Sequence, residues 1–143
     1  MTLDERHRVD SPTASRLASR MFMQVAVQKC WQVIGWDVPT AFLQQDTKYA
    51  GQRKPVHMVP PHEIRQYEDE VWLMNKITYG LADAPRAWYF SICTFLKELG
   101  ATQLPGEPCV FIFKENGELC GQILLHVHDG VMAGTGSRPS NAI

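Results

Sequence analysis

The 143-residue sequence lacks several features that would assign it directly to a functional class. Its net charge is −1, whereas a stand-alone nucleic-acid-binding domain usually carries a basic face. Its four cysteines form no C-x-x-C pair, which disfavours a zinc ribbon and favours buried, reduced thiols. No apolar run approaches the roughly 20 residues of a membrane span, and the N-terminus is polar rather than signal-like. We therefore expect a soluble intracellular protein, in the cytoplasm or the nucleus, with no membrane partner.

Internal repeats and low-complexity blocks are absent as well, and the remaining composition is that of an ordinary globular protein. Hydrophobic residues make up 45% and charged residues 20% of the chain, and this length supports one domain with a real core. Both ends are polar and turn-rich. We expect a loose N-terminal segment over residues 1–10, a folded domain over 11–134, and a disordered tail over 135–143.

Apolar spacing and turn signals predict a mixed order of helices and strands. Ser11-Pro12 indicates the start of an amphipathic helix that runs to about residue 30, and a longer helix follows Asp83, with Pro85 in its first turn and Gly100 after its end. Asn116-Gly117 is a strong hairpin signal. Strands are predicted over 33–36, 54–61, 70–77, 109–114 and 119–127 and in a hairpin over 124–134, with a short helix over 41–43. This order predicts an α+β fold in which helices pack on one face of a largely antiparallel sheet.

Two aspartates lie at the ends of predicted strands. Asp37 follows the strand over 33–36, and Asp129 lies at the tip of the hairpin over 124–134. If these strands are neighbours, the carboxylates converge, and oxygen ligands suit Mg²⁺ ions that activate a 3′-hydroxyl and stabilise a leaving pyrophosphate. Spacing alone favours a structural alternative, in which Asp37 caps the short helix and Asp129-Gly130 is a hairpin turn.

The same hairpin tip carries His126 and His128, which gives a further alternative. Two histidines two residues apart on a strand share a face, as strand-borne zinc ligands can. With Asp129 they could form a transition-metal site, although the sequence shows no further ligand cluster. A magnesium site, a transition-metal site and an ordinary hairpin tip therefore stand as three hypotheses.

Three blocks of the sequence, in this order, resemble the reverse transcriptase of copia-type LTR retrotransposons. They read WDVPTAFLQQ from residue 36, LMNKITYGLADAPRAWY from residue 73 and LLHVHDGVMAG from residue 124. The segment SPTASRLASRMFMQVAVQ also resembles the family's helix before the first block, so the resemblance covers about residues 11–134. It implies a partial reverse transcriptase domain of a Pol polyprotein, folded as a polymerase palm with part of the fingers.

The resemblance implies a role for each matching residue. Asp37 and Asp129 match metal-binding carboxylates, for which Mg²⁺ (or Mn²⁺) is the implied cofactor. Phe42, beside Ala41, matches the aromatic residue under the incoming sugar, and Tyr79-Gly80 matches the block against the nascent base pair and the dNTP. Phe42 and Tyr79 are equally compatible with core aromatics, and Gly80 with a turn. Pro85 and Arg86 match the start of the supporting helix, where we interpret Arg86 as a surface cation.

The implied reaction is two-metal-ion, template-directed DNA synthesis from dNTPs. Its implied partners are an RNA/DNA template–primer, the dNTP and the rest of the Pol polyprotein. The finger strands expected before residue 11 and the thumb expected after residue 134 are not evident.

His128 stands where the family has the first aspartate of a Y-V-D-D hairpin. The tip of this chain reads His126-Val127-His128-Asp129. Imidazole is neutral or cationic near neutral pH and a softer ligand than carboxylate, so the site loses a negative charge. We expect the isolated chain to be inactive, either as one segment of a longer polymerase or as a non-catalytic transposon relic.

Overall fold

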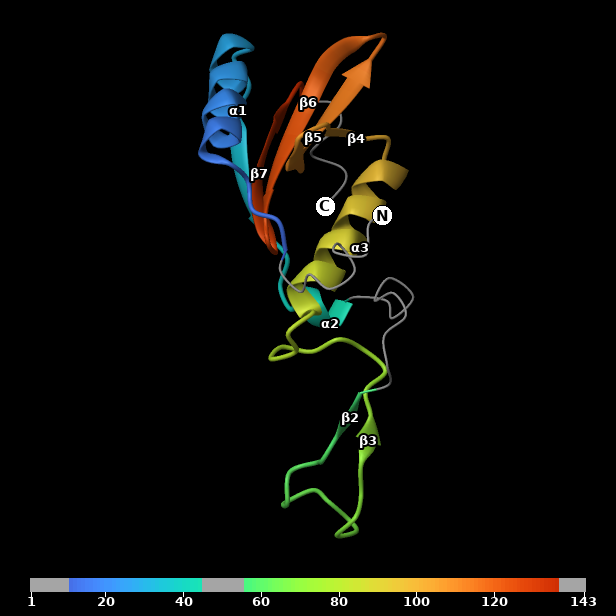
Figure 1. Ribbon diagram of the computed structural model, residues 1–143. Coiled ribbons are helices and arrows are strands. Elements are labelled where there is room, and N and C mark those ends of the chain that lie inside the picture. Colours follow the sequence, from blue (N-terminus) through green and yellow to red (C-terminus); the bar gives the residue numbers. More distant parts are fainter. Residues whose placement is uncertain (1–10, 45–55, 137–143) are drawn as a thin grey trace.

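The computed structural model describes residues 11–44 and 56–136, which form an α+β structure (Figure 1). The elements in chain order are α1 (Arg16–Gln28), β1 (Val33–Asp37), α2 (Ala41–Gln44), β2 (His57–Met58), β3 (Trp72–Leu73), α3 (Ala84–Glu98), β4 (Thr102–Leu104), β5 (Glu107–Glu115), β6 (Glu118–His126) and β7 (Asp129–Gly134). The predicted α+β class and the antiparallel sheet are confirmed. In the described part of the chain, no helix is long and apolar enough to cross a membrane.

The main sheet has five antiparallel strands in the order β1-β7-β6-β5-β4. The predicted β5–β6 hairpin is confirmed: Asn116 and Gly117 both have positive φ, 52° and 84°, as a type I′ turn requires. Strand β4 was not predicted, because it has only three residues. Pairing brings β1, which comes early in the sequence, beside the last strand, β7.

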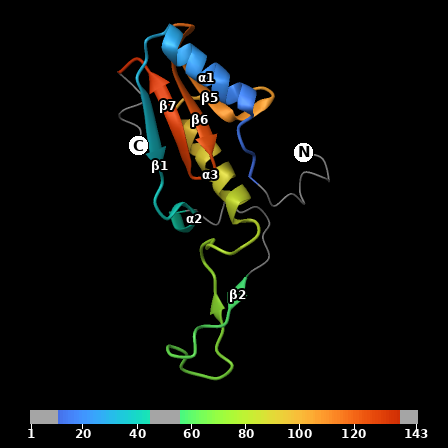
Figure 2. The same ribbon diagram turned by 90° about the vertical axis from the view of Figure 1, so that its left-hand side faces the viewer.

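The prediction that helices pack on one face of the sheet is wrong, because α1 and α3 cover opposite faces (Figures 1 and 2). On β6, Ile123 and Leu125 belong to the core under α3, whereas Leu124 between them packs with Phe22 and Ala26 of α1. Successive side chains of a strand point to opposite faces, so a run of consecutive apolar residues needs cover on both sides. The larger core lies under α3 and includes the fully buried side chains Phe111, Ile77, Leu96, Leu125 and Cys109.

Helix α1 begins later than predicted. Its N-cap is Ser15, whose hydroxyl oxygen accepts from the Ala18 N–H and whose O–H donates to the Glu107 carboxylate of β5. The buried amide of Gln122 on β6 donates to the Phe22 carbonyl at 2.8 Å, which ties the middle of the helix to the sheet. The start signal at Ser11-Pro12 is therefore not the helix cap.

Both long helices end in the same hydrogen-bond pattern, but only one uses glycine. After α3, Gly100 has φ +88°, and the N–H groups of Gly100 and Ala101 donate to Lys97 and Leu96. After α1, Cys30 takes the equivalent left-handed position with φ +53°. This thiol is exposed, contrary to the expectation of buried cysteines, whereas Cys93 and Cys109 are buried. Burial raises the pKa of both of those thiols to about 11.

Cys30→Gly is expected to raise the free energy of unfolding by about 0.5–1 kcal/mol, because glycine adopts a left-handed conformation without a Cβ clash. Urea denaturation of both chains measures this difference. Lys29→Gly is the matched control, because Lys29 has φ −87° and a glycine there relieves no strain. Equal or lower stability of the Cys30→Gly chain would contradict the expectation.

Strands β2 and β3 form a short two-stranded ribbon that projects away from the main sheet (Figure 1). The predicted strands over 54–61 and 70–77 are each reduced to two residues, because Pro60 and Pro61 cannot donate to a ladder and, within residues 11–44 and 56–136, no third strand supports the pair. The predicted loose segment over 1–10 and residues 137–143 of the predicted tail lie outside the described residues. Thr135, the first residue of that predicted tail, donates its backbone N–H to Cys120.

Candidate functional site

Asp37 and Asp129 face one another across two paired strands. Asp37 is the last residue of β1, Asp129 is the first residue of β7, and the two are register partners. The condition set for their convergence, that the two strands are neighbours, is therefore met. The alternative of an Asp129-Gly130 turn is wrong: the turn consists of Val127 and His128, and His126 pairs with Asp129 across it.

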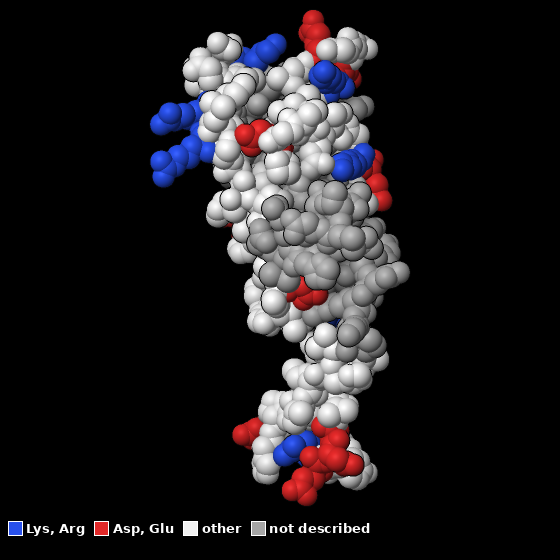
Figure 3. Space-filling view, in the orientation of Figure 1, with Lys and Arg blue, Asp and Glu red and all other residues white. Residues whose placement is uncertain are grey.

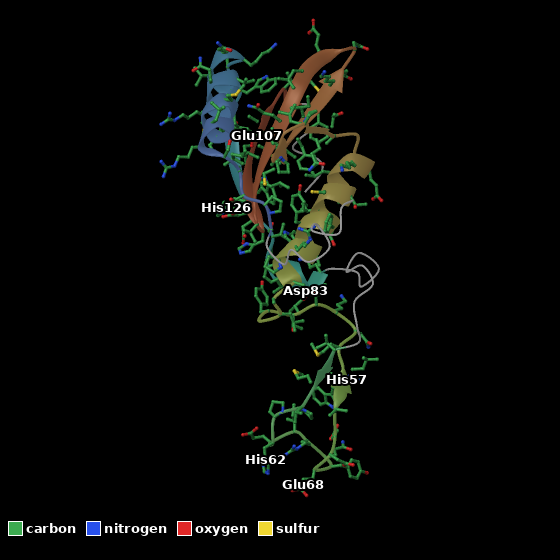
Figure 4. All side chains as sticks on the ribbon, in the orientation of Figure 1. His57, His62, Glu68, Asp83, Glu107 and His126 are labelled. Atoms are coloured by element: carbon green, nitrogen blue, oxygen red, sulfur yellow. The ribbon has the colours of Figure 1, made fainter. Side chains whose placement is uncertain are left out.

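Each carboxylate at this edge is hydrogen-bonded to an imidazole. His128 Nδ1 lies 2.8 Å from Asp37 Oδ1, and His126 Nδ1 lies 3.2 Å from Asp129 Oδ1. A carboxylate accepts, so the Nδ1–H groups donate in both pairs. The four side chains are between 45% and 67% exposed, and His126 lies at the end of the sheet (Figure 4). The site is an open surface cluster in which carboxylates and imidazoles alternate.

The backbone of the turn is held from two sides. Val127 has φ +56°, an unfavourable conformation for a β-branched residue. The indole N–H of Trp88 on α3 donates to the Val127 carbonyl at 2.8 Å, and the Val38 N–H donates to the His128 carbonyl at 2.9 Å. The helical spacing of apolar residues in α3 predicts only a core position for Trp88. A buried indole N–H needs an acceptor, and that requirement is the signal that could have indicated this contact.

An aromatic cluster lies beside the turn. The rings of Phe42 and Tyr79 are 4.8 Å apart between centroids, and the His128 ring meets Phe42 edge-on at 6.3 Å. Ala41 and Phe42 are buried, whereas Tyr79 is 55% exposed. Gly80 has φ +90°, which favours glycine. The structure therefore brings the predicted substrate-binding residues beside the hairpin tip.

Arg86 lies on the first turn of α3, where its guanidinium is 5.0 Å from the centroid of the Phe90 ring. Such a contact stabilises the helix locally. Arg86 is half-buried, so the interpretation of it as a surface cation is met only in part. Asp83 is the N-cap residue of the same helix, as predicted, but its side chain makes no capping hydrogen bond.

Close packing of Trp36 on Gly130 joins β1 to β7 next to the aspartates. The two residues are register partners. A Cβ atom on Gly130 would lie 2.8 Å from an edge carbon of the Trp36 indole and would overlap the Leu124 carbonyl oxygen. The Trp36 N–H has no hydrogen-bond partner among the described residues. The absence of a side chain on Gly130 therefore allows the indole ring to approach β7 closely.

The donor set at this edge does not fit a pair of Mg²⁺ ions. Mg²⁺ prefers oxygen ligands in octahedral geometry, but one of the three expected carboxylate positions is an imidazole and both remaining carboxylates already accept from imidazoles. Over residues 11–44 and 56–136, no group of three or more His, Cys, Asp or Glu side chains is arranged to hold a metal ion. The hypothesis of a His/Asp transition-metal site gains no support from this arrangement.

The chain is similar to the reverse transcriptase part of known Pol polyproteins. Residues 3–141 match the family model described as reverse transcriptase (RNA-dependent DNA polymerase). The chain is 30% identical over 128 residues to a retrovirus-related Pol polyprotein from transposon TNT 1-94 of Nicotiana tabacum, covering 87% of this chain and 9% of that protein. The Pol polyproteins from transposons RE2 and RE1 of Arabidopsis thaliana match with the same identity and the same share of this chain, and 8% of their own length. No solved structure matches.

Proposed function

This chain belongs to the reverse transcriptase (RNA-dependent DNA polymerase) family of retrotransposon Pol polyproteins, and from that premise we propose that it is a palm segment without catalytic activity. It spans about 9% of the length of the tobacco relative, so the activity of a whole Pol polyprotein is not assigned to it. In this proposal, residues 11–134 are a partial palm with part of the fingers. The segment keeps the shape of the catalytic hairpin and lacks its metal-binding charge.

The observation that carries the proposal is the hydrogen bond between His128 and Asp37. At 2.8 Å, an imidazole occupies the side of the Asp37 carboxylate on which the family resemblance expects a second carboxylate. Two carboxylates at this spacing would concentrate negative charge for cations, whereas a carboxylate–imidazole pair is at most singly negative. The Asp37 carboxylate already accepts a hydrogen bond from His128, so its affinity for Mg²⁺ is expected to be low.

The residues beside the turn support a palm that has kept the surface on which the family would bind the dNTP. Phe42 and Ala41 remain buried beside the turn, and Tyr79 and Gly80 lie next to Phe42, where a sugar and a base pair would be accommodated. We assign these four residues to dNTP contact in the ancestral enzyme, with Asp37 and Asp129 as its metal-binding carboxylates. An RNA/DNA template–primer and the rest of the Pol polyprotein are the partners that this assignment implies.

Family membership suggests dependence on a divalent metal in general, so metal affinity tests the proposal directly. His128→Asp in the 143-residue chain is expected to tighten Mn²⁺ binding by about tenfold or more, because it restores a carboxylate beside Asp37. Electron paramagnetic resonance of free Mn²⁺ measures the affinity of both chains.

His126→Asp is the matched control for this measurement. It introduces the same carboxylate two residues away, on the imidazole that bonds Asp129 instead of Asp37. Its Mn²⁺ affinity is expected to stay within a few-fold of the unchanged chain. If the unchanged chain binds Mn²⁺ as tightly as His128→Asp, or if both variants gain equally, the proposed effect of position 128 is wrong.

A further inference from the structure

The tip of the β2–β3 ribbon combines acidic and apolar side chains, all of them away from the core. We call residues 62–73 the ribbon tip. Its exposed large apolar side chains are Ile64, Tyr67, Val71, Trp72 and Leu73. Four acidic residues and one basic residue share this segment: Glu63, Glu68, Asp69, Glu70 and Arg65. Figure 3 shows the acidic cluster at the end of the molecule, and Figure 4 places His62 and Glu68 there.

The ribbon tip has a defined internal structure. The Glu70 carboxylate accepts from the backbone N–H groups of Gln66 and Tyr67, at 2.6 and 3.3 Å, and from the Trp72 indole N–H at 2.7 Å. These bonds, led by the one from Trp72, lower the pKa of Glu70. Arg65 donates to the Glu68 carbonyl at 3.1 Å. The loop therefore presents its apolar side chains from a fixed backbone, although no described element of the same chain covers them.

The outer face of α1 has the opposite charge and a similar apolar content. We call this surface the helix face: Arg16, Leu17, Arg20, Met21, Met23 and Val27. Leu17 is 64% and Val27 is 73% exposed, and Met21 and Met23 are exposed beside them. The helix contains no acidic residue, and Lys29 follows at its C-cap. A shallow depression runs over this face between Arg20 and Val27.

These two surfaces lie at opposite ends of the molecule, so they cannot meet within one chain (Figures 1 and 3). We propose that the ribbon tip of one copy docks on the helix face of a second copy, in an antiparallel dimer. Such an arrangement is two-fold symmetric, so the contact forms twice and neither complementary surface stays exposed. Acidic side chains would then meet Arg16 and Arg20, and each ribbon's apolar residues would cover those of the helix.

A second copy is favoured over nucleic acid as the occupant by the charges themselves. The ribbon tip carries three more acidic than basic residues, four against one, and would repel a phosphate backbone. A purely apolar partner would leave these carboxylates and the two arginines of the helix face without counter-charges. The helix face offers both basic and exposed apolar side chains, which complement the acidic and apolar side chains of the ribbon tip.

Sedimentation equilibrium of the 143-residue chain tests the dimer. At about 100 μM and low salt, a micromolar interface is mostly associated. Glu68→Lys/Asp69→Lys reverses the ribbon tip and leaves Glu70 in place, and Arg16→Glu/Arg20→Glu reverses the helix face without opposing the helix dipole. We expect each double variant alone to dimerise at least about tenfold more weakly, and an equimolar mixture of the two to recover the dimer.

The equimolar mixture is the decisive experiment. One variant then has two basic surfaces and the other has two acidic surfaces, so each of the two contacts in a mixed dimer joins opposite charges. Glu115→Lys/Glu118→Lys, at the β5–β6 turn and outside both proposed surfaces, is the matched control and should dimerise like the unchanged chain. Raising salt from about 50 to about 500 mM should weaken the dimer, and this arm needs no variant to fold. A monomeric unchanged chain, a dimer indifferent to both reversals and to salt, or a mixture that stays monomeric would each overturn the proposal.

Discussion

His128→Asp is expected to raise primer extension by about a thousandfold or more when residues 11–134 replace the matching segment of a complete family polymerase. The physical reason is charge. With histidine, Asp37 accepts a hydrogen bond at 2.8 Å and has no carboxylate neighbour at position 128. With aspartate, three carboxylates would surround the edge where β1 meets β7, and divalent cations would stabilise the developing charge of the leaving pyrophosphate.

Extension of a labelled DNA primer on an RNA template measures this gain. The tobacco Pol polyprotein is the polymerase into which the segment is inserted, because its similarity to this chain over 128 residues identifies the segment to replace. Template–primer binding by both chimeras serves as the folding control, since it does not depend on position 128. Equal extension rates for two chimeras that bind template–primer equally would show that histidine at position 128 does not lower the rate of DNA synthesis.

Gly130→Ala is expected to lower the free energy of unfolding by about 3 kcal/mol, the upper end of overpacking costs. The added methyl group would overlap the Leu124 carbonyl oxygen and lie 2.8 Å from the Trp36 ring. Because Leu124 O is a backbone atom of the neighbouring strand, the strands must separate, whereas a flexible side chain could simply turn aside. Thermal and urea unfolding of the 143-residue chain measure the loss.

Gly35→Ala is the matched control for this substitution. Gly35 lies on β1, next to Trp36, and an added Cβ atom meets nothing within 4 Å. Its replacement should leave stability within about 0.5 kcal/mol of the unchanged chain or raise it slightly, because alanine restricts the unfolded state. Equal effects of the two alanines would mean that the Trp36–Gly130 contact does not determine how closely β1 and β7 pack.

The sequence predicted those features that depend on local signals. Asn116-Gly117 required a specific turn, Gly100 ended α3, and Val33 to Trp36 formed a strand. It also predicted that Asp37 and Asp129 would converge, although only on the condition that their strands were neighbours. That condition depends on pairing between residues about 90 positions apart, which no local pattern specifies.

The misses that bear on the site depend on tertiary contacts. Asp129-Gly130 has a favourable turn sequence, yet the turn forms at Val127-His128, because pairing of β1 with β7 and the hydrogen bond from Trp88 determine the register. The alternation of faces in β6 places α1 opposite α3, but the apolar run of β6 looks the same whichever helix covers it. The imidazole–carboxylate pairs likewise arise only once the hairpin is formed.

The two anchors of the β6–β7 turn both bind carbonyl oxygens, those of Val127 and His128. Every amino acid supplies that acceptor, so neither anchor discriminates between an aspartate and a histidine at position 128. A substitution at position 128 therefore removes neither hydrogen bond, and the turn can keep its backbone conformation when the side chain changes. The conformation of the hairpin is thus independent of the side chain at position 128, so related copies can share this turn even where that residue differs.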